Sequence, residues 1–226
     1  MSQFLDMGSQ DARRAIVINP RYPLLMQTPT LEGPGVRLEP LSLEHLPTLE
    51  AIAFDPHIWK YMTRNVQTPA DLRAWVDDAL AAVATGKTLA WVTIKKADPA
   101  DPAAKDQLIG STRFLDLDLH NRTVEIGHTW LNDACRGTRV NTEAKLLQLT
   151  YAFETLDLVR VALKTHAHNH RSQAAIKAIG ATYEGTFRSH ILMPDGSHRD
   201  SAWFSILCTE WPDVKDLLNR RLNAPL

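Results

Sequence analysis

The chain has 226 residues, 44% hydrophobic and 23% charged, which fits one globular domain or a domain of about 180 residues with an extension. Its 25 Lys and Arg against 26 Asp and Glu exclude the basic surplus that is typical of proteins that bind nucleic acid or anionic membranes. Two cysteines cannot form a disulfide framework, and no apolar run approaches the roughly 20 residues of a membrane-spanning helix, so we expect a cytoplasmic protein without nucleic-acid or membrane partners.

The first segment, residues 1–34, mixes proline, glutamine, glycine and arginine without sustained periodicity. It lacks the layout of a secretory signal, in which a basic segment is followed by an apolar one and a small-residue cleavage site. The hydrophobic pattern becomes regular from Val36 onward. We therefore predict an N-terminal extension or arm over 1–34 and one domain over 35–226.

Two helices are predicted after a short alternating strand over 36–41. The first covers 42–54. The second is better marked, because Thr68 can cap it, Pro69 occupies the first helical position and Gly86 ends it.

Three strands follow, over 88–96, 106–118 and 122–131, separated by a loop rich in proline and aspartate and then by a turn. The next helix is predicted over 141–155. Its apolar residues form two stripes, so we expect it to be buried against a sheet. The stripes are Val140, Ala144, Leu147 and Tyr151, and Leu146, Leu149, Phe153 and Leu156.

The remaining pattern predicts a strand over 158–167, a helix over 169–180, a hairpin with strands over 182–192 and 199–207, and a final helix over 211–222. The order is β-α-α-β-β-β-α-β-α-β-β before that last helix. It predicts a mixed α/β domain with one central sheet. Strands joined by hairpins should be antiparallel, and the pair joined by the helix over 141–155 should be parallel.

The stretch ACRGTRVNTEAKLL, residues 134–147, connects a strand to a helix. The first N–H groups of a helix have no partner within it, and with the helix dipole they form a site for an anion such as phosphate. Arg136 and Arg139 would add charged contacts to phosphate oxygens. The alternative is an ordinary turn whose arginines face solvent. The stretch is not a nucleotide P-loop, because it lacks both Gly-Lys-Ser/Thr and GxGxxG.

The run from Glu125 to Gly185, together with the element order over 36–207, resembles the GNAT (Gcn5-related) N-acetyltransferase superfamily. In particular it resembles the branch of ribosomal-protein N-terminal acetyltransferases and their uncharacterised relatives. The resemblance implies a mixed α/β fold whose mostly antiparallel sheet has one parallel strand pair splayed at the coenzyme site. It also implies acetyl transfer, without a metal, from acetyl-CoA to a primary amine by direct attack in a ternary complex. The amine would belong to a protein N-terminus, an amino acid or a small amine.

The family's pyrophosphate loop has the pattern Arg/Gln-x-x-Gly-x-Gly/Ala, but here Arg139 replaces the first Gly and Asn141 the second. If the first position needs a positive φ, Arg139 costs about 1–2 kcal/mol. If it needs only a close backbone approach, the side chain can turn outward and bind the 3′-phosphate or the diphosphate, which the unbroken helix pattern favours. The coenzyme residues implied are Trp130, Leu131, Arg136, Gly137, Thr138, Arg139, Val140, Asn141, Thr142, Asn169 and Ser172.

For catalysis, the resemblance implies Glu125 as the base that takes the amine's proton, with His128 as second choice. Strand alternation places Glu125 with Gly127 and Thr129 on one face, and His128 on the other face with Trp130. Both can face the acceptor only if a β-bulge intervenes. The alternatives are an ion-paired strand glutamate and a core histidine.

Other catalytic groups come from the same resemblance. Ile176 occupies the position where many family members have a tyrosine as general acid. Ser172 or water would therefore protonate the leaving thiolate, or no acid is needed. Asn169 either binds the pantetheine arm or caps its own helix. The backbone N–H of Trp130 or Leu131 would polarise the thioester carbonyl.

The candidates for lining the acceptor site are Trp59, Arg64, Trp91 and Arg113; the alternative is that they are ordinary core or rim residues. Three other hypotheses are weaker. They are a zinc site at His166, His168 and His170, a Cys135 nucleophile, and a GNAT-like domain that binds acyl-CoA or a partner without transferring an acetyl group. Homodimerisation through the last hairpin or the C-terminal helix is left open.

Overall fold

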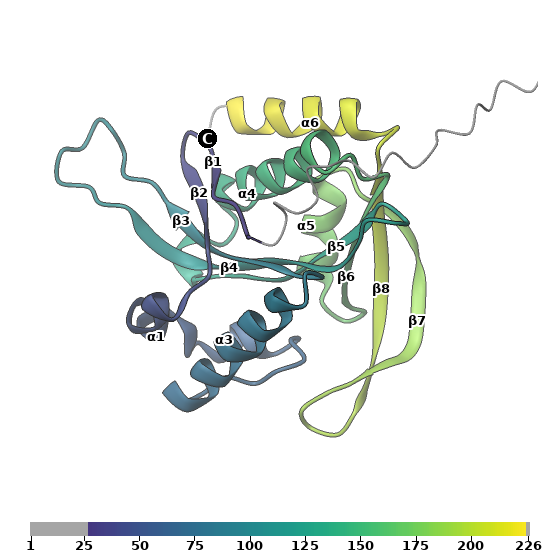
Figure 1. Ribbon diagram of the computed structural model, residues 1–226, viewed down its shortest axis with the longest axis horizontal. Helices are drawn as coiled ribbons and strands as arrows, with labels where there is room; N and C mark the ends of the chain where they lie inside the picture. The colour runs from purple at the N-terminus through teal and green to yellow at the C-terminus, as the bar shows by residue number, and fades with distance from the viewer. Residues whose placement is uncertain (1–26, 225–226) are drawn as a thin grey trace, which may run out of the picture.

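The computed structural model describes residues 27–224, which form an eight-stranded sheet with helices on both faces (Figure 1). The strands are β1 (Leu31–Glu32), β2 (Val36–Pro40), β3 (Leu89–Lys95), β4 (Gln107–Asp118), β5 (Thr123–Leu131), β6 (Arg160–His166), β7 (Thr182–Leu192) and β8 (His198–Leu207). The α-helices are α1 (Leu46–Ala53), α2 (Pro56–Trp59), α3 (Pro69–Ala84), α4 (Arg139–Thr150), α5 (His170–Ala178) and α6 (Trp211–Asn223).

The sheet order is β1-β2-β3-β4-β5-β6-β8-β7, and every neighbouring pair is antiparallel except β5 and β6. The parallel pair arises because α4 carries the chain from β5 back to the start of β6, whereas the hairpins reverse its direction. The predicted mixed α/β fold with one mostly antiparallel sheet and one parallel pair is confirmed.

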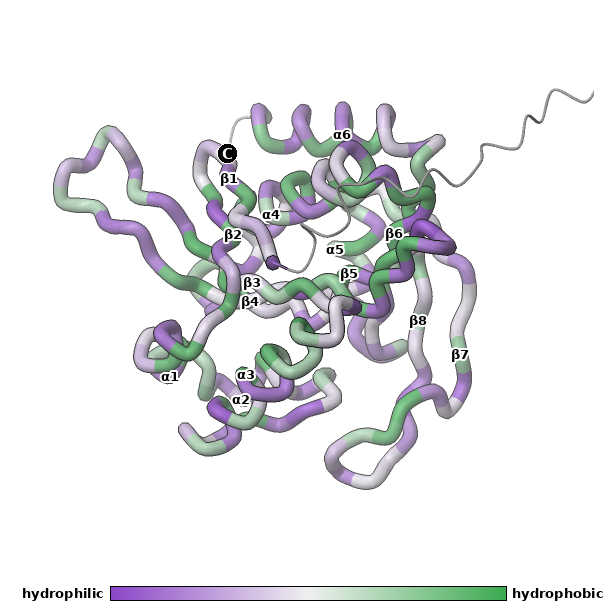
Figure 2. Tube along the Cα trace, in the orientation of Figure 1, coloured by the Kyte–Doolittle hydropathy of each residue, from purple (hydrophilic) through white to green (hydrophobic). Residues whose placement is uncertain are grey.

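Two hydrophobic clusters cover the two faces of the sheet. On one face α4, α5 and α6 bury a cluster that includes Phe114, Leu149 and Phe204 (Figure 1). On the other face α1, α2 and α3 bury a cluster around Leu72 and Trp75. Figure 2 shows the same division, with hydrophobic residues along the central strands and alternating polar and apolar residues along the outer helix α6.

Most predicted elements are found, with shifts at their ends. At α3, Thr68 accepts a hydrogen bond from the third helical N–H, and Gly86 follows the helix with φ +74°. Helix α4 begins at Arg139, two residues before the predicted start at 141, because the Thr138 side chain already caps it. Its last part, Tyr151–Thr155, is a π-helix. Helix α1 is preceded by a 3-10 turn rather than starting at residue 42.

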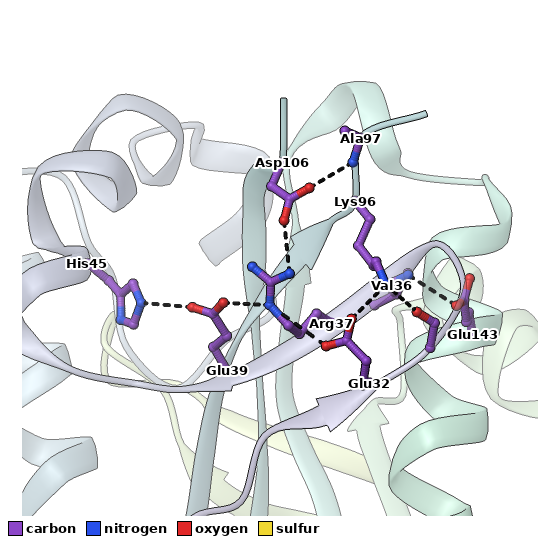
Figure 3. A network of polar contacts seen from close by, with 10 residues as sticks. Glu32, Val36, Arg37, Glu39, His45, Lys96, Ala97, Asp106 and Glu143 are labelled. Carbon is purple, nitrogen blue, oxygen red and sulfur yellow. Dashed lines mark hydrogen bonds and ion pairs between the residues drawn. The ribbon is translucent and has the colours of Figure 1, made fainter. Parts of the chain in front are cut away.

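The described part of the predicted N-terminal extension is joined to the sheet, because β1 pairs with β2. Residues 1–26 lie outside the described residues, so the proposed boundary at 34 stays a prediction. Helix α4 holds this edge: the Glu143 carboxylate accepts hydrogen bonds from the N–H groups of Gly35 (2.8 Å) and Val36 (3.1 Å) (Figure 3). The helix that follows the predicted phosphate loop is therefore tied to the far edge of the sheet.

Candidate active site

A cavity of about 1190 Å³ lies where β5 and β6 separate. These strands pair only from Thr123 and Arg160 to Ile126 and Leu163, although both continue beyond that point. The cavity is lined by the ends of β5 and β6, the loop before α4, the start of α5, the segment after α2, and β8. It therefore connects the predicted coenzyme loop with both predicted bases.

A β-bulge in β5 brings these bases together. His128 has φ +48°, and the β4–β5 register shifts by one residue beside it. Past the bulge, Thr129 faces α4, where its hydroxyl contacts Lys145, and Trp130 packs on the opposite face against Trp59 and Trp75. The simple alternation that placed Thr129 with Glu125 and Trp130 opposite is therefore wrong. The bulge that was needed to bring Glu125 and His128 to one cavity is present.

Glu125 is buried and holds a short ion pair, 2.6 Å from Oε2 to Lys164 Nζ on the neighbouring strand. Burial raises the pKa of Glu125, and the Lys164 ammonium opposes that rise. A carboxylate whose pKa lies above its ordinary value is a better proton acceptor near neutral pH. Glu125 is therefore an ion-paired strand glutamate, and the ion pair does not exclude it from the role of base.

His128 is half-buried, and its Nδ1 has no hydrogen-bond partner among residues 27–224. Loss of solvent, followed by the positive charge of Arg113 and then of Lys164, lowers the pKa of His128 to about 3. The ring is therefore neutral at physiological pH but takes up a proton weakly. This electrostatic setting favours Glu125 over His128 as the base.

Gly127 leaves the space that the Glu125 carboxylate occupies. A Cβ at this position would lie 2.7 Å from Leu115 Cδ1 and 3.1 Å from Glu125 Oε1. We expect Gly127→Ala to lower kcat/KM by up to about 100-fold, because small displacements of a catalytic group are costly. Steady-state kinetics beside the thermal unfolding curve would test this. An unchanged kcat/KM would show that the position of Glu125 does not limit the reaction.

The loop before α4 presents free backbone donors. The N–H groups of Gly137 and Arg139 have no hydrogen-bond partner within the described part of the chain. Gly137 has φ +76° and nothing within 4 Å of the position where a Cβ would be. The position of the loop that needs a positive φ is therefore 137, and a glycine occupies it. The free N–H donors and the open space beside them are what an anion site requires.

Arg139 has helical backbone geometry as the first residue of α4, so the penalty for a positive φ does not arise. Its side chain turns away from the cavity and donates a hydrogen bond to the Ala224 carbonyl beyond the end of α6. This position fits the interpretation in which the backbone approaches the coenzyme closely and the Arg139 side chain turns outward. A contact between Arg139 and phosphate stays a prediction.

Arg136 lines the cavity, but its guanidinium is already engaged. It donates to the Leu131 carbonyl (3.0 Å) and pairs with Asp133 (3.1 Å) and Asp55 (3.0 Å). Asp55 caps the short helix α2, so Arg136 joins the loop to the helical layer on the other face. Arg136 thus holds the loop against α2, and its contact with phosphate stays a prediction.

The start of α5 forms the opposite wall of the cavity. Asn169 Oδ1 accepts a hydrogen bond from the Ser172 N–H (3.1 Å), so the capping alternative for Asn169 is present. Asn169, Ser172 and Ile176 all line the cavity. Of the remaining predicted coenzyme residues, Trp130, Leu131, Gly137 and Asn141 line it, while Thr138, Val140 and Thr142 shape the first turn of α4.

The four acceptor candidates lie in different places. Trp91 is on the α4 face, where its Nε1 donates to the Pro29 carbonyl. Arg64 is exposed and pairs with Asp78. Trp59 and Arg113 are buried under α3, with Arg113 stacked on Trp75, and neither lines the cavity. We therefore carry none of the four into the proposed acceptor site.

Sequence reasoning missed Lys145, which lines the cavity from α4 and is buried. Its ammonium donates to Thr112 Oγ1 (3.1 Å), Thr129 Oγ1 (3.0 Å) and Gln148 Oε1 (2.7 Å), beside the bulge. Burial lowers its pKa to about 7. The signal was present: Asn141, Lys145 and Gln148, at helical spacing, fall between the two apolar stripes of α4.

The zinc and cysteine hypotheses find no support in the described residues. Within residues 27–224 no three His, Cys, Asp or Glu side chains are placed to hold a metal ion, although His166 and His168 stack with ring centroids 5.1 Å apart. Cys135 is buried and does not line the cavity. None of the described helices has the length and apolar character to cross a membrane.

Comparison with known proteins gives the family. The model of the "Acetyltransferase (GNAT) domain" matches residues 36–182. The curated "Putative ribosomal N-acetyltransferase YdaF" of Bacillus subtilis (strain 168) is 36% identical over 108 residues, which are 48% of this chain and only 58% of that protein.

Solved structures agree. A GCN5-related N-acetyltransferase from Brucella melitensis is 28% identical with a TM-score of 0.76, over 88% of this chain and 87% of that one. Mycobacterium smegmatis RimJ in complex with CoA-disulfide shares the fold at 19% identity and a TM-score of 0.70, over 87% and 96%. The chain belongs to the GNAT acetyltransferase superfamily.

Proposed function

We propose that the protein is a cytoplasmic N-acetyltransferase that moves an acetyl group from acetyl-CoA to a primary amine. The observation that carries this proposal is a cavity that is lined both by the loop before α4, with its free amides, and by Glu125. The loop amides would bind the diphosphate of the coenzyme. The gap between β5 and β6 would admit its pantetheine arm, because backbone groups there lack a strand partner.

In the proposed reaction Glu125 accepts a proton from the acceptor ammonium, directly or through a water molecule. The neutral amine then attacks the thioester carbonyl, so that an amide bond forms and the carbon–sulfur bond breaks. Backbone N–H groups just past the bulge, at Trp130 or Leu131, polarise the carbonyl. The leaving thiolate takes its proton from Ser172 or from water. Lys164 keeps the Glu125 carboxylate in place at 2.6 Å.

The acceptor is proposed to be the amine of a protein N-terminus, an amino acid or a small molecule. The name of the B. subtilis relative refers to ribosomal N-acetylation, which supports a polypeptide N-terminus. Dimerisation through the β7–β8 hairpin or through α6 stays a prediction. In the hairpin, β7 is the edge strand of the sheet and exposes Tyr183, Phe187 and Leu192.

The coenzyme site is tested by Gly137→Ala, with Gly86→Ala as the matched control. Both glycines have a φ near +75° and open space around them, so both variants should lose similar stability. Only Gly137 belongs to the proposed loop. We expect calorimetry to show acetyl-CoA binding to the wild type, about 5- to 30-fold weaker binding to Gly137→Ala, and unchanged binding to Gly86→Ala.

Transfer itself is tested by the release of free thiol from acetyl-CoA in the presence of a panel of primary amines. Coenzyme binding without thiol release would favour the alternative, a module that binds acyl-CoA and transfers nothing. Absence of binding heat with the wild type would contradict both functions.

A further inference from the structure

Arg199, at the start of β8, is buried with 7% of its surface exposed, and it lines the cavity. Its Nε donates to Ser201 Oγ (3.1 Å) and its Nη1 to the Tyr61 carbonyl (3.0 Å). Both acceptors are neutral. No carboxylate lies within 4.0 Å of Arg199 anywhere in the described part of the chain, and its Nη2 has no hydrogen-bond partner there.

Two buried arginines of the described chain, Arg113 and Arg199, have no carboxylate partner, and of these two only Arg199 lines the cavity. Arg160, on the same face of the sheet, pairs with Glu184, and Arg136 pairs with two aspartates. Placing a guanidinium out of water without a counter-charge is costly, so such a residue is expected where a ligand supplies the charge. Burial accordingly lowers the pKa of Arg199, and the Glu125 carboxylate opposes that fall.

The charges around the proposed acceptor end do not balance without a ligand. The carboxylates that line the cavity are Asp55 and Asp133, both engaged by Arg136, and Glu125, paired with Lys164. Two buried cations of the lining then have no carboxylate within 4.0 Å among the described residues: Lys145, whose ammonium is held by three neutral acceptors, and Arg199, whose Nη2 is free. Arg199 and Glu125 are also close enough to affect each other's pKa.

We propose, on the basis of the transferase function above, that the amine acceptor carries a carboxylate close to its amine and that Arg199 binds this carboxylate. With the amine at Glu125, the free Nη2 and the unused donors of the guanidinium would hold the carboxylate through charged hydrogen bonds. The β7–β8 hairpin extends on the α3 side of the sheet (Figure 1). Its Arg199 contacts the carbonyl of Tyr61, in the segment after α2, and both residues line the cavity. The carboxylate can belong to a free amino acid or to an acidic residue following the N-terminus of a polypeptide.

The test uses pairs of acceptors that differ in this carboxylate, with rates compared at equal concentrations of the neutral amine, because amidation of an α-carboxylate also lowers the pKa of the amine. Serine is compared with serinamide, and a tripeptide amide with aspartate in second position is compared with its asparagine counterpart. We expect the wild type to prefer one carboxylate over its amide by about 10- to 100-fold in kcat/KM, the value of a charged hydrogen bond. The pair that shows the preference identifies the source of the carboxylate.

Arg199→Gln should reduce that preference to within about twofold, because both members then meet a neutral side chain. Arg160→Gln, which alters an ion-paired arginine on the same sheet face, should keep the wild-type preference. A merely structural role for Arg199 would lower both rates of a pair equally, and that result would overturn the proposal. So would a wild type without preference.

Calorimetric binding of the same compounds to the coenzyme-loaded protein separates this inference from the proposed function. If the carboxylate form binds in a way that depends on Arg199 but no amine is acetylated, the transferase proposal is contradicted and the carboxylate site is supported. If amines are acetylated but the carboxylate and amide forms bind equally, the transferase proposal is supported and the carboxylate site is contradicted.

Discussion

Glu125→Gln is expected to lower kcat by about 10²- to 10⁴-fold at neutral pH while acetyl-CoA still binds, because glutamine keeps the shape of the side chain but cannot accept the proton. Glu125 lies on β5 away from the loop amides, so the coenzyme dissociation constant should change little. Pre-steady-state acetylation rates together with calorimetry would measure both quantities.

A matched control is Glu184→Gln. Glu184 is also a strand glutamate in an ion pair, with Arg160, but it does not line the cavity. Its replacement should leave kcat near the wild-type value. In the wild type, the rate should rise with pH as Glu125 loses its proton, at a pH above the ordinary glutamate range because burial raises that pKa. Equal rates for wild type and Glu125→Gln from pH 6 to 9 would remove Glu125 from the role of base.

Lys145→Met is expected to change how stability depends on pH. The pKa of Lys145 is about 7 in the folded protein and 10.5 for an ordinary lysine, so between these values the unfolded chain binds more protons. The contribution of this site to the free energy of unfolding must then rise with pH from about 7 to 10.5. Below about pH 7 the ammonium is charged in the folded protein, and the full cost of burying it is present. From pH 7 to pH 9 the gain is about 2 kcal/mol in the free energy of unfolding.

Lys145→Met removes this site, so its stability relative to the wild type should fall by about 2 kcal/mol between pH 7 and pH 9. Denaturant unfolding at several pH values measures the difference, and taking it against the wild type cancels the other titrating groups. Lys177→Met, on the exposed side of α5, provides the control with a parallel pH profile. Parallel curves for Lys145→Met would show that the ammonium is not desolvated.

The order of elements could be predicted because each long segment carries a strong local signal. The Thr68 cap, the Gly86 stop and the alternation along β6 depend only on neighbouring residues. The parallel pairing of β5 and β6 follows from the helix between them. The bulge at His128 has no such signal, because a positive φ at a histidine is imposed by contacts with β4 and α4.

The site was predictable only where one segment contains it. The strand-loop-helix from Glu125 to Asn141 supplies about a third of the residues that line the cavity, and its composition suggested an anion site from sequence alone. Arg199 and Tyr61 come from segments 138 residues apart, and their contact depends on how the hairpin meets the α2–α3 segment. The three neutral acceptors of Lys145 come from α4 and from two strands distant in sequence, so their meeting around the ammonium could not be predicted from α4 alone.

The hydrogen bonds from the N–H groups of Gly35 and Val36 to the Glu143 carboxylate limit how far the N-terminus can be truncated in experiments. Glu143 lies one turn into the helix whose first residues form the proposed phosphate loop. A truncation that starts after residue 36 would leave its carboxylate without these donors and free the first turn of α4 to shift. Deletion work on the N-terminal arm should therefore stop before Leu31, or a loss of coenzyme affinity would be misread as a role for the arm itself.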